Sequence, residues 1–217
     1  MEIDRFEFER ALLQEGMARV AGVDEAGRGP LAGPVVAAAV MFPVAWARDG
    51  LPEALRGLND SKQLKPAQRE CYFGMLTASS EIRFAVSIVD AGTIDAINIL
   101  RATHQAMNEA LARLTPPPQH VLVDGLRVGS LAFPQTPLVR GDARSYSIAA
   151  ASVIAKVTRD RLMDDYDQQF PAYGFARHKG YGTVRHLAAL AEHGPCPLHR
   201  RSFAPLKLPQ PELFDLQ

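Results

Sequence analysis

The sequence has few of the features that mark disulfide-stabilised, zinc-binding or membrane proteins. Its 217 residues include only two cysteines, Cys71 and Cys196, which lack zinc-motif spacing and would remain thiols in a reducing compartment. No apolar run is long enough to cross a membrane, and the first residues are acidic where a signal peptide is basic and then apolar. We therefore expect a cytoplasmic protein that does not associate with membranes.

The net charge is zero, because 24 basic residues balance 24 acidic ones. A neutral chain is not expected to have general affinity for nucleic acids. The distribution is uneven, however. Residues 1–15 carry five acids and two bases, whereas residues 177–207 carry six bases and one acid. The second segment predicts a local basic surface of the kind that nucleic-acid-binding proteins use.

Hydrophobic patterning predicts an α/β fold with a mixed sheet in a chain long enough for one sizeable core. A hairpin is expected from residues 20–25 and 35–41, followed by a turn-rich connector over 43–57. The later expected elements are helices over 65–78, 93–114, 145–170 and 183–192, strands over 82–89, 121–124 and 138–142, and a loop over 171–182.

Three of the expected strands end in acidic residues: Asp24-Glu25, Asp124 and Asp142. Neighbouring strand residues point to opposite faces, so Asp24 and Glu25 can serve one site only where the strand ends or through a backbone carbonyl. A simple hairpin turn explains the first stretch equally well when it is taken alone. The repetition of an acid at further strand ends favours a common site.

Carboxylates gathered at one sheet edge repel one another unless hard cations such as Mg²⁺ or Mn²⁺ hold them together. Two such ions about 4 Å apart can clamp the attacking and leaving oxygens of a phosphodiester. If the strands end at the same edge, the acids predict a metal site for phosphoryl transfer. A metal-free nuclease would need an acid–base pair, and the six histidines show no pairing pattern that suggests one. A nucleotide hydrolase fits poorly, because the glycine-rich turn over residues 27–33 lacks the Gly-Lys-Ser/Thr of a P-loop.

Six motifs follow one another along the chain: Val-Asp-Glu-Ala-Gly-Arg-Gly-Pro at 23–30, Leu-Asn-Asp-Ser-Lys at 58–62, Val-Asp-Gly at 123–125, Gly-Asp at 141–142, Ala-Ser-Val-Ile-Ala-Lys-Val-Thr-Arg-Asp at 151–160 and His-Lys-Gly-Tyr-Gly-Thr at 178–183. Together they resemble the bacterial ribonuclease HII family, the type 2 ribonucleases H, over roughly residues 19–207. The resemblance implies a ribonuclease H-like mixed sheet flanked by helices. It divides the chain into an N-terminal extension (1–18), a catalytic domain (19–170) and a C-terminal helical and irregular region (171–217) that completes the substrate-binding surface.

The resemblance also implies an activity. The expected enzyme is a metal-dependent endoribonuclease that cleaves the RNA strand of RNA/DNA hybrids and nicks 5′ of single ribonucleotides in duplex DNA, leaving a 3′-hydroxyl and a 5′-phosphate. It would use Mn²⁺ or Mg²⁺, two ions with substrate bound, and act as a monomer in replication and repair, with no protein partner identified. A module that binds hybrids without cleaving them remains the alternative.

Residue roles follow from the same resemblance. Asp24, Glu25, Asp124 and Asp142 match the catalytic, metal-binding acids, and the turn Gly27-Arg28-Gly29 matches the segment that reads the ribonucleotide 2′-hydroxyl. Tyr181 matches a tyrosine that stacks on the following sugar, and Lys62 and Lys179 are candidate phosphate contacts. Without the family, Arg28 reads as a surface charge, Tyr181 as a core aromatic, and the acidic cluster 164–167 as a solvated helix face. Lys156 and Arg159 could pair with Asp160 or Asp164.

Overall fold

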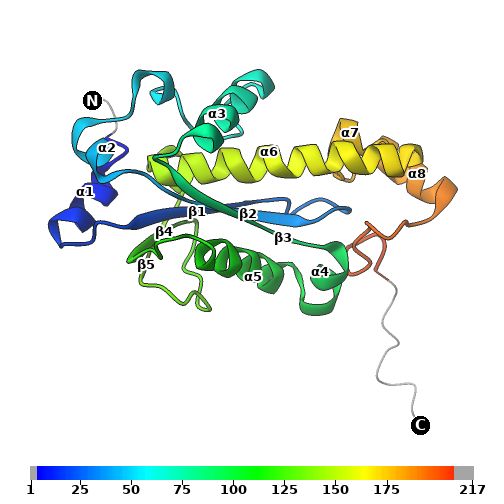
Figure 1. The fold of residues 1–217 in the computed structure, drawn as a ribbon. Coiled ribbons are helices and arrows are strands. Elements are labelled where there is room, and N and C mark those ends of the chain that lie inside the picture. Colours follow the sequence, from blue (N-terminus) through cyan, green and yellow to red (C-terminus); the bar gives the residue numbers. More distant parts are fainter. Residues whose placement is uncertain (1–3, 208–217) are drawn as a thin grey trace, which may run out of the picture.

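A five-stranded sheet forms the centre of the computed structural model, which describes residues 4–207 (Figure 1). The spatial order is β3-β2-β1-β4-β5, with β1 antiparallel to β2, β2 antiparallel to β3, and parallel pairs β1–β4 and β4–β5. The expected mixed sheet and hairpin are therefore confirmed. The strands are β1 Val20–Ala26, β2 Val35–Met41, β3 Arg83–Val89, β4 His120–Asp124 and β5 Gln135–Leu138.

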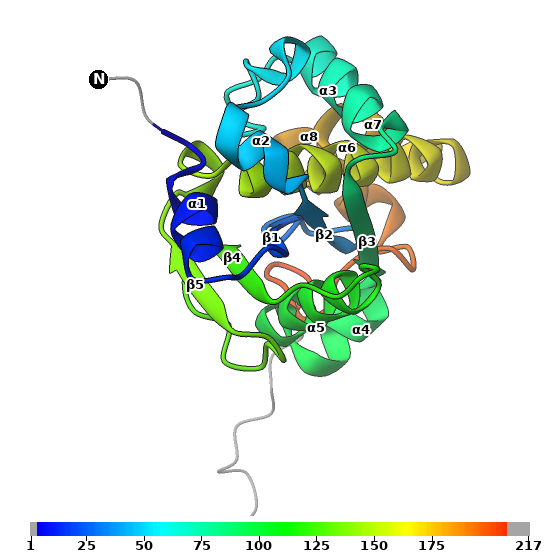
Figure 2. The same cartoon turned by 60° about the vertical axis from the view of Figure 1, so that its left-hand side comes forward.

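Helices cover both faces of this sheet (Figures 1 and 2). The long helix α6 (Tyr146–Gln169) and α3 (Pro66–Ala78) lie on one face, and α4 (Ala91–Ile97) and α5 (Ile99–Ala112) lie on the other. At one end of the sheet are α1 (Glu7–Gln14) and α2 (Val44–Asp49), while α7 (Phe175–His178) and α8 (Val184–His193) pack near the far end of α6. Within residues 4–207, no helix has the length and apolar character needed to span a bilayer.

The first turns of α6 lie very close to β1. A Cβ atom added at Gly22 would stand 2.3 Å from the backbone of Ser147 and Ile148, so only glycine permits this approach. The small residues Ala149, Ala150 and Ala151 are fully buried there, as the sequence pattern predicts. This packing places the N-terminal half of α6 beside the strand that carries Asp24.

Several element predictions were wrong. The expected helix over 93–114 is two helices, because Asn98 adopts φ 69° and its side chain accepts a hydrogen bond from the Arg101 amide at the start of α5. The expected connector contains α2, the loop over 171–182 contains a 3-10 turn at Pro171–Tyr173 and α7, and the N-terminal extension contains the unpredicted α1.

Asp142 does not end a strand. The strand β5 stops at Leu138, Arg140 turns into the left-handed region with φ 56°, and Asp142 lies in a short 3-10 turn, Gly141–Ala143. The turn leads directly into α6, whose N-cap residue is Ser145. The position of Asp142 therefore depends on the start of α6 rather than on a strand end.

Candidate active site

Parallel pairing of β1 with β4 brings two of the predicted acids together. Val23 is in register with Val123, so the next residues, Asp24 and Asp124, occupy equivalent positions on adjacent strands. The turn after β5 adds Asp142, and one carboxylate oxygen from each of the three lies within 4.8 Å of the others. The structure thus assembles three of the four predicted acids from distant parts of the chain.

Glu25 does not belong to this close group. As the strand neighbour of Asp24 it points differently, and its carboxylate accepts a hydrogen bond from Nη1 of Arg28 at 3.3 Å. It nevertheless lines the same cleft, of about 480 Å³, together with Asp24, Lys62, Tyr181 and the turn Gly27–Gly29. Glu25 is thus beside the cluster, at the start of the turn.

Burial and mutual repulsion make the carboxylates of Asp24 and Asp142 hard to ionise. Burial raises the pKa of Asp24 well above its ordinary value, and Glu25 and Asp124 raise it further. Burial, Asp124 and Asp60 raise the pKa of Asp142 to about 6. Carboxylates that resist losing their protons when close together are a donor set suited to hard divalent cations, which would relieve the repulsion.

Lys62 and two serines surround the cluster. Burial lowers the pKa of Lys62, but the carboxylates, Asp24 foremost, outweigh burial and raise it, so its ammonium group faces the acids. The buried hydroxyls of Ser61 and Ser152 lie 2.7 Å apart, and Ser152 partly offsets the rise that burial causes in the pKa of Asp24. These serines had no distinguishing sequence signal beyond their place inside matched motifs.

Two buried arginines, Arg159 and Arg200, donate hydrogen bonds to backbone carbonyls of the glycine-rich turn and the residues that follow it. Gly27 has φ 98°, and a Cβ atom there would stand 2.1 Å from Nε of Arg159. Arg159 does not pair with Asp160 or Asp164; it donates to the carbonyls of Ala32, Pro34 and Lys179. Lys156 does pair with Asp160, at 2.7 Å.

Arg200 makes the closest contacts to this turn. Its guanidinium donates to the carbonyl oxygens of Gly27 at 2.6 Å, Arg28 at 2.9 Å and Gly33 at 2.8 Å. Burial lowers its pKa to about 9, so the group is still charged at neutral pH. In the sequence Arg200 cannot be told from its exposed neighbour Arg201, and both belong to the segment predicted to form a basic surface. Arg200 is instead fully buried.

Tyr181 lies at the rim of the cleft and is 48% exposed, so it is not a core aromatic. A Cβ atom at Gly29 would touch its ring at 3.7 Å, which places the ring next to the turn. Lys179 is less available, because its ammonium group is paired with Asp164 and also contacts the Asp160 carbonyl at 3.3 Å. Asp164, in the acidic cluster interpreted as a solvated face, is thus engaged by an ion pair.

A chain of buried histidines fixes the backbone of Tyr181. The Cys196 amide donates to Nδ1 of His199 at 3.0 Å, so neutral His199 carries its proton on Nε2. That nitrogen lies 3.0 Å from Nε2 of His186, whose Nδ1 in turn donates to the Tyr181 carbonyl at 2.9 Å. A proton added to His186 at Nε2 would face the Nε2–H of His199, and one added to His199 at Nδ1 would face the Cys196 amide N–H. The arrangement therefore requires both imidazole rings to be neutral.

This network predicts acid sensitivity. Burial, with His186 second, lowers the pKa of His199 from 6.5 to about 4, so the unfolded chain binds more protons between these values. The free energy of unfolding therefore falls as pH drops from about 6.5 to about 4, by up to about 3 kcal/mol from this residue. Urea denaturation across this range should show a smaller decline for His199→Gln than for wild type, whereas the exposed control His193→Gln should follow wild type. Equal declines for all three proteins would refute the assignment.

Comparison with known proteins decides the family. The family model described as ribonuclease HII matches residues 21–206, which include every element after α1 except the first residue of β1. The chain belongs to the ribonuclease HII family. Ribonuclease HII of Geobacter metallireducens is 52% identical over 200 residues, 92% of this chain and 90% of that protein.

Solved structures agree with this family assignment. The crystal structure of ribonuclease H2 from Pyrococcus horikoshii OT3 matches with a TM-score of 0.71 and 30% identity, covering 87% of this chain and 95% of the other. Ribonuclease HII in the PCNA complex from Archaeoglobus fulgidus matches with a TM-score of 0.69 and 26% identity, covering 90% and 98%. The ribonuclease H-like fold is confirmed, and the chain is an endoribonuclease that cleaves the RNA of RNA/DNA hybrids.

Proposed function

We propose that this ribonuclease HII also nicks duplex DNA on the 5′ side of a single embedded ribonucleotide, leaving a 3′-hydroxyl and a 5′-phosphate. The observation that supports this most is the single cleft in which the acids Asp24 and Glu25, the turn Gly27–Gly29 and Tyr181 meet. A site that acts at one ribonucleotide must recognise that sugar beside the cleaved bond. The 2′-hydroxyl is the group that separates RNA from DNA.

The four acids are proposed to hold Mn²⁺ or Mg²⁺, two ions when substrate is bound. Asp24, Asp124 and Asp142 offer the clustered oxygens, and Glu25 adds a further carboxylate in the cleft that Asp24 lines. Divalent cations bound there supply charge neutralisation and Lewis-acid stabilisation of the phosphoryl oxygens. The donor set, all carboxylate oxygen with raised pKa values at Asp24 and Asp142, fits such ions.

The chain's own residues bind and orient the substrate. Backbone groups of Gly27, Arg28 and Gly29 bind the 2′-hydroxyl, because glycines let the main chain approach a sugar closely. Tyr181 stacks on the next sugar, and Lys62, which faces the acids, binds a phosphate near the cleaved bond. Lys179 remains a predicted phosphate contact that would first have to leave Asp164.

Tyr181 comes from the C-terminal region and lines the cleft, which supports the proposal that residues from 171 onward complete the substrate-binding surface of the 19–170 domain. The cytoplasmic location, the monomeric state and a replication or repair partner remain predictions. The predicted tail after residue 207 lies outside the described residues.

Cleavage of a duplex containing one ribonucleotide tests the proposal directly. We expect a single nick 5′ of the ribonucleotide with Mg²⁺ or Mn²⁺, none with EDTA, and none on a matched all-DNA duplex or one with a 2′-O-methyl group at the same position. Extension of the upstream fragment by a DNA polymerase would identify the 3′-hydroxyl. Cleavage of long hybrids without nicking at the single ribonucleotide would contradict the proposal, and metal-independent binding without any cleavage would favour a binding module.

A further inference from the structure

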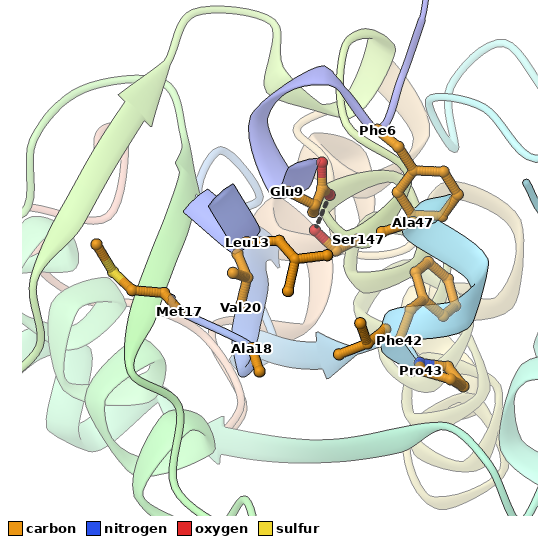
Figure 3. A pocket seen from close by; sticks show the side chains of 11 residues that line it. Phe6, Glu9, Leu13, Met17, Ala18, Val20, Phe42, Pro43, Ala47 and Ser147 are labelled. Carbon is orange, nitrogen blue, oxygen red and sulfur yellow. Dashed lines mark hydrogen bonds between the residues drawn. The ribbon is translucent and has the colours of Figure 1, made fainter. Parts of the chain in front are cut away.

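The helix α1 lies outside residues 21–206 that match the family, yet it carries a buried acid. Glu9 is 6% exposed and is surrounded by apolar side chains that include Phe6, Leu13 and Val20 (Figure 3). Burying a carboxyl group in such surroundings costs several kcal/mol unless hydrogen bonds compensate. The environment of Glu9 therefore calls for a specific explanation.

The compensation comes from the start of α6. The hydroxyls of Ser145 and Ser147 both donate to Oε1 of Glu9, each at 2.7 Å, and Figure 3 shows Glu9 directed at Ser147. Among the described residues, Oε2 has no hydrogen-bond partner. The N-terminus of a long helix also favours a negative charge at this place. Glu9 thus ties α1 to the first turn of α6.

One of these two serines leads on to the acidic cluster. The Ser145 amide donates to the Gly141 carbonyl at 2.7 Å, and the Gly141 amide donates to Oδ1 of Asp124 at 2.7 Å. Asp142 lies inside this short loop, and its own amide is 3.4 Å from the same Asp124 oxygen. A continuous path of hydrogen bonds therefore runs from Glu9 through Ser145 and Gly141 to Asp124.

We propose that Glu9 is a positioning residue for the metal-binding acids: through Ser145 it fixes the turn that holds Asp142 and Asp124 at their present separation. This inference rests on the proposed metal-binding role of those acids. It gives the N-terminal extension, to which the sequence assigns no function, a part in building the active site. Arg5 adds to this anchoring, because its carbonyl accepts from the Tyr146 amide at 3.1 Å and its guanidinium donates to the Leu58 carbonyl at 2.7 Å, ahead of Lys62.

Ser145 and Ser147 provide a comparison for the test. Both donate to the same Glu9 oxygen at 2.7 Å and their hydroxyls lie 3.0 Å apart, but only the Ser145 amide continues to Gly141. Mn²⁺ binding by isothermal titration calorimetry is the main readout, with no substrate present. We expect Glu9→Ala and Ser145→Ala to weaken Mn²⁺ binding about 5- to 10-fold. This is at or below the low end of the roughly 10- to 100-fold typical of groups that bond metal ligands directly, because Glu9 acts through Ser145 and Gly141. Glu9→Gln, which keeps an acceptor oxygen, should stay within about 2-fold of wild type, as should Ser147→Ala.

Stability must be separated from positioning. Leu12→Ala removes buried apolar packing on the same helix without touching the hydrogen-bond path, so it should lower the melting temperature while leaving Mn²⁺ affinity unchanged. If Glu9→Ala unfolds, Ser145→Ala against Ser147→Ala decides the question. Equal Mn²⁺ affinity in wild type, Ser145→Ala and, where it folds, Glu9→Ala would overturn this inference alone. Absence of Mn²⁺ binding by wild type would instead overturn the proposed metal site.

Discussion

Asp24→Asn and Asp142→Asn are expected to lower kcat for cleavage by about 1000-fold or more. Each substitution removes a charged oxygen ligand from a cluster whose oxygens lie within 4.8 Å of one another. Metal stabilisation of a phosphoryl transition state is worth several kcal/mol, and about 4 kcal/mol corresponds to about 1000-fold in rate. Single-turnover cleavage of a hybrid in Mg²⁺ would measure the loss without interference from product release.

The lost activity should not reflect lost folding. Burial and neighbouring acids raise the pKa of Asp142 from 3.8 to about 6, so the folded protein binds more protons than the unfolded chain between these values. The contribution of Asp142 to the free energy of unfolding therefore falls as pH rises from 3.8 to about 6, and it is lowest above pH 6. In EDTA at pH 8, Asp142→Asn should unfold at a temperature equal to or above that of wild type. The exposed control Asp165→Asn should keep full activity. An inactive Asp165→Asn, or an active Asp24→Asn, would contradict the assignment.

Arg200→Met is expected to destabilise the protein and to weaken recognition of the ribonucleotide. The substitution leaves the carbonyls of Gly27, Arg28 and Gly33 without their buried donor, and each such group costs about 1–3 kcal/mol. The total loss should reach about 3 kcal/mol or more. Arg201→Met changes the neighbouring arginine, which is exposed, and should leave the free energy of unfolding unchanged.

The effect on recognition follows from peptide geometry. In a planar trans peptide the carbonyl and the following N–H point in opposite directions. Because Arg200 holds the carbonyls of Gly27 and Arg28, the amides of Arg28 and Gly29 must point away from it, and these residues line the cleft. Loss of the guanidinium frees the two peptide planes to rotate, which removes the fixed backbone contacts proposed for the 2′-hydroxyl.

Measurements should separate this effect from destabilisation. At a temperature where Arg200→Met is folded, kcat/KM for the embedded ribonucleotide should fall by about 10- to 100-fold, as expected when groups that fix a site are lost. Mn²⁺ affinity should stay near wild type, because Arg200 does not contact the acids. An Arg200→Met protein that is less stable but cleaves embedded ribonucleotides with unchanged kcat/KM would show that Arg200 is structural only.

The sequence allowed much of the sheet to be predicted because most of its strands are short, mainly apolar runs with clear ends, such as Val35–Met41. The repeated Val-Asp ending at Val23-Asp24 and Val123-Asp124 suggested a common site, and parallel pairing brings the two strand ends side by side. Their parallel pairing could not be read from one sequence, because it depends on a crossover of about 100 residues through β2, β3 and α5. Asp142 was placed at a strand end, whereas the left-handed Arg140 moves it into a turn.

Long-range polar contacts were the part that sequence patterns missed. Arg200 looks like Arg201 until the fold buries one and exposes the other. In the sequence Glu9 is one of several charges in an acidic extension. In the fold it accepts a hydrogen bond from Ser145, the N-cap of α6, which is 136 residues further along the chain. Contacts of this kind have no local period or spacing, since they are fixed only when distant elements pack.

Anomalous X-ray diffraction from crystals soaked in Mn²⁺ is the most direct test of the central claim that folding gathers distant acids into one divalent-cation site. We predict an anomalous peak among the carboxylates of Asp24, Asp124 and Asp142 in wild type, and its loss in Asp142→Asn. A peak elsewhere, or none at these carboxylates in fully soaked wild-type crystals, would contradict the account.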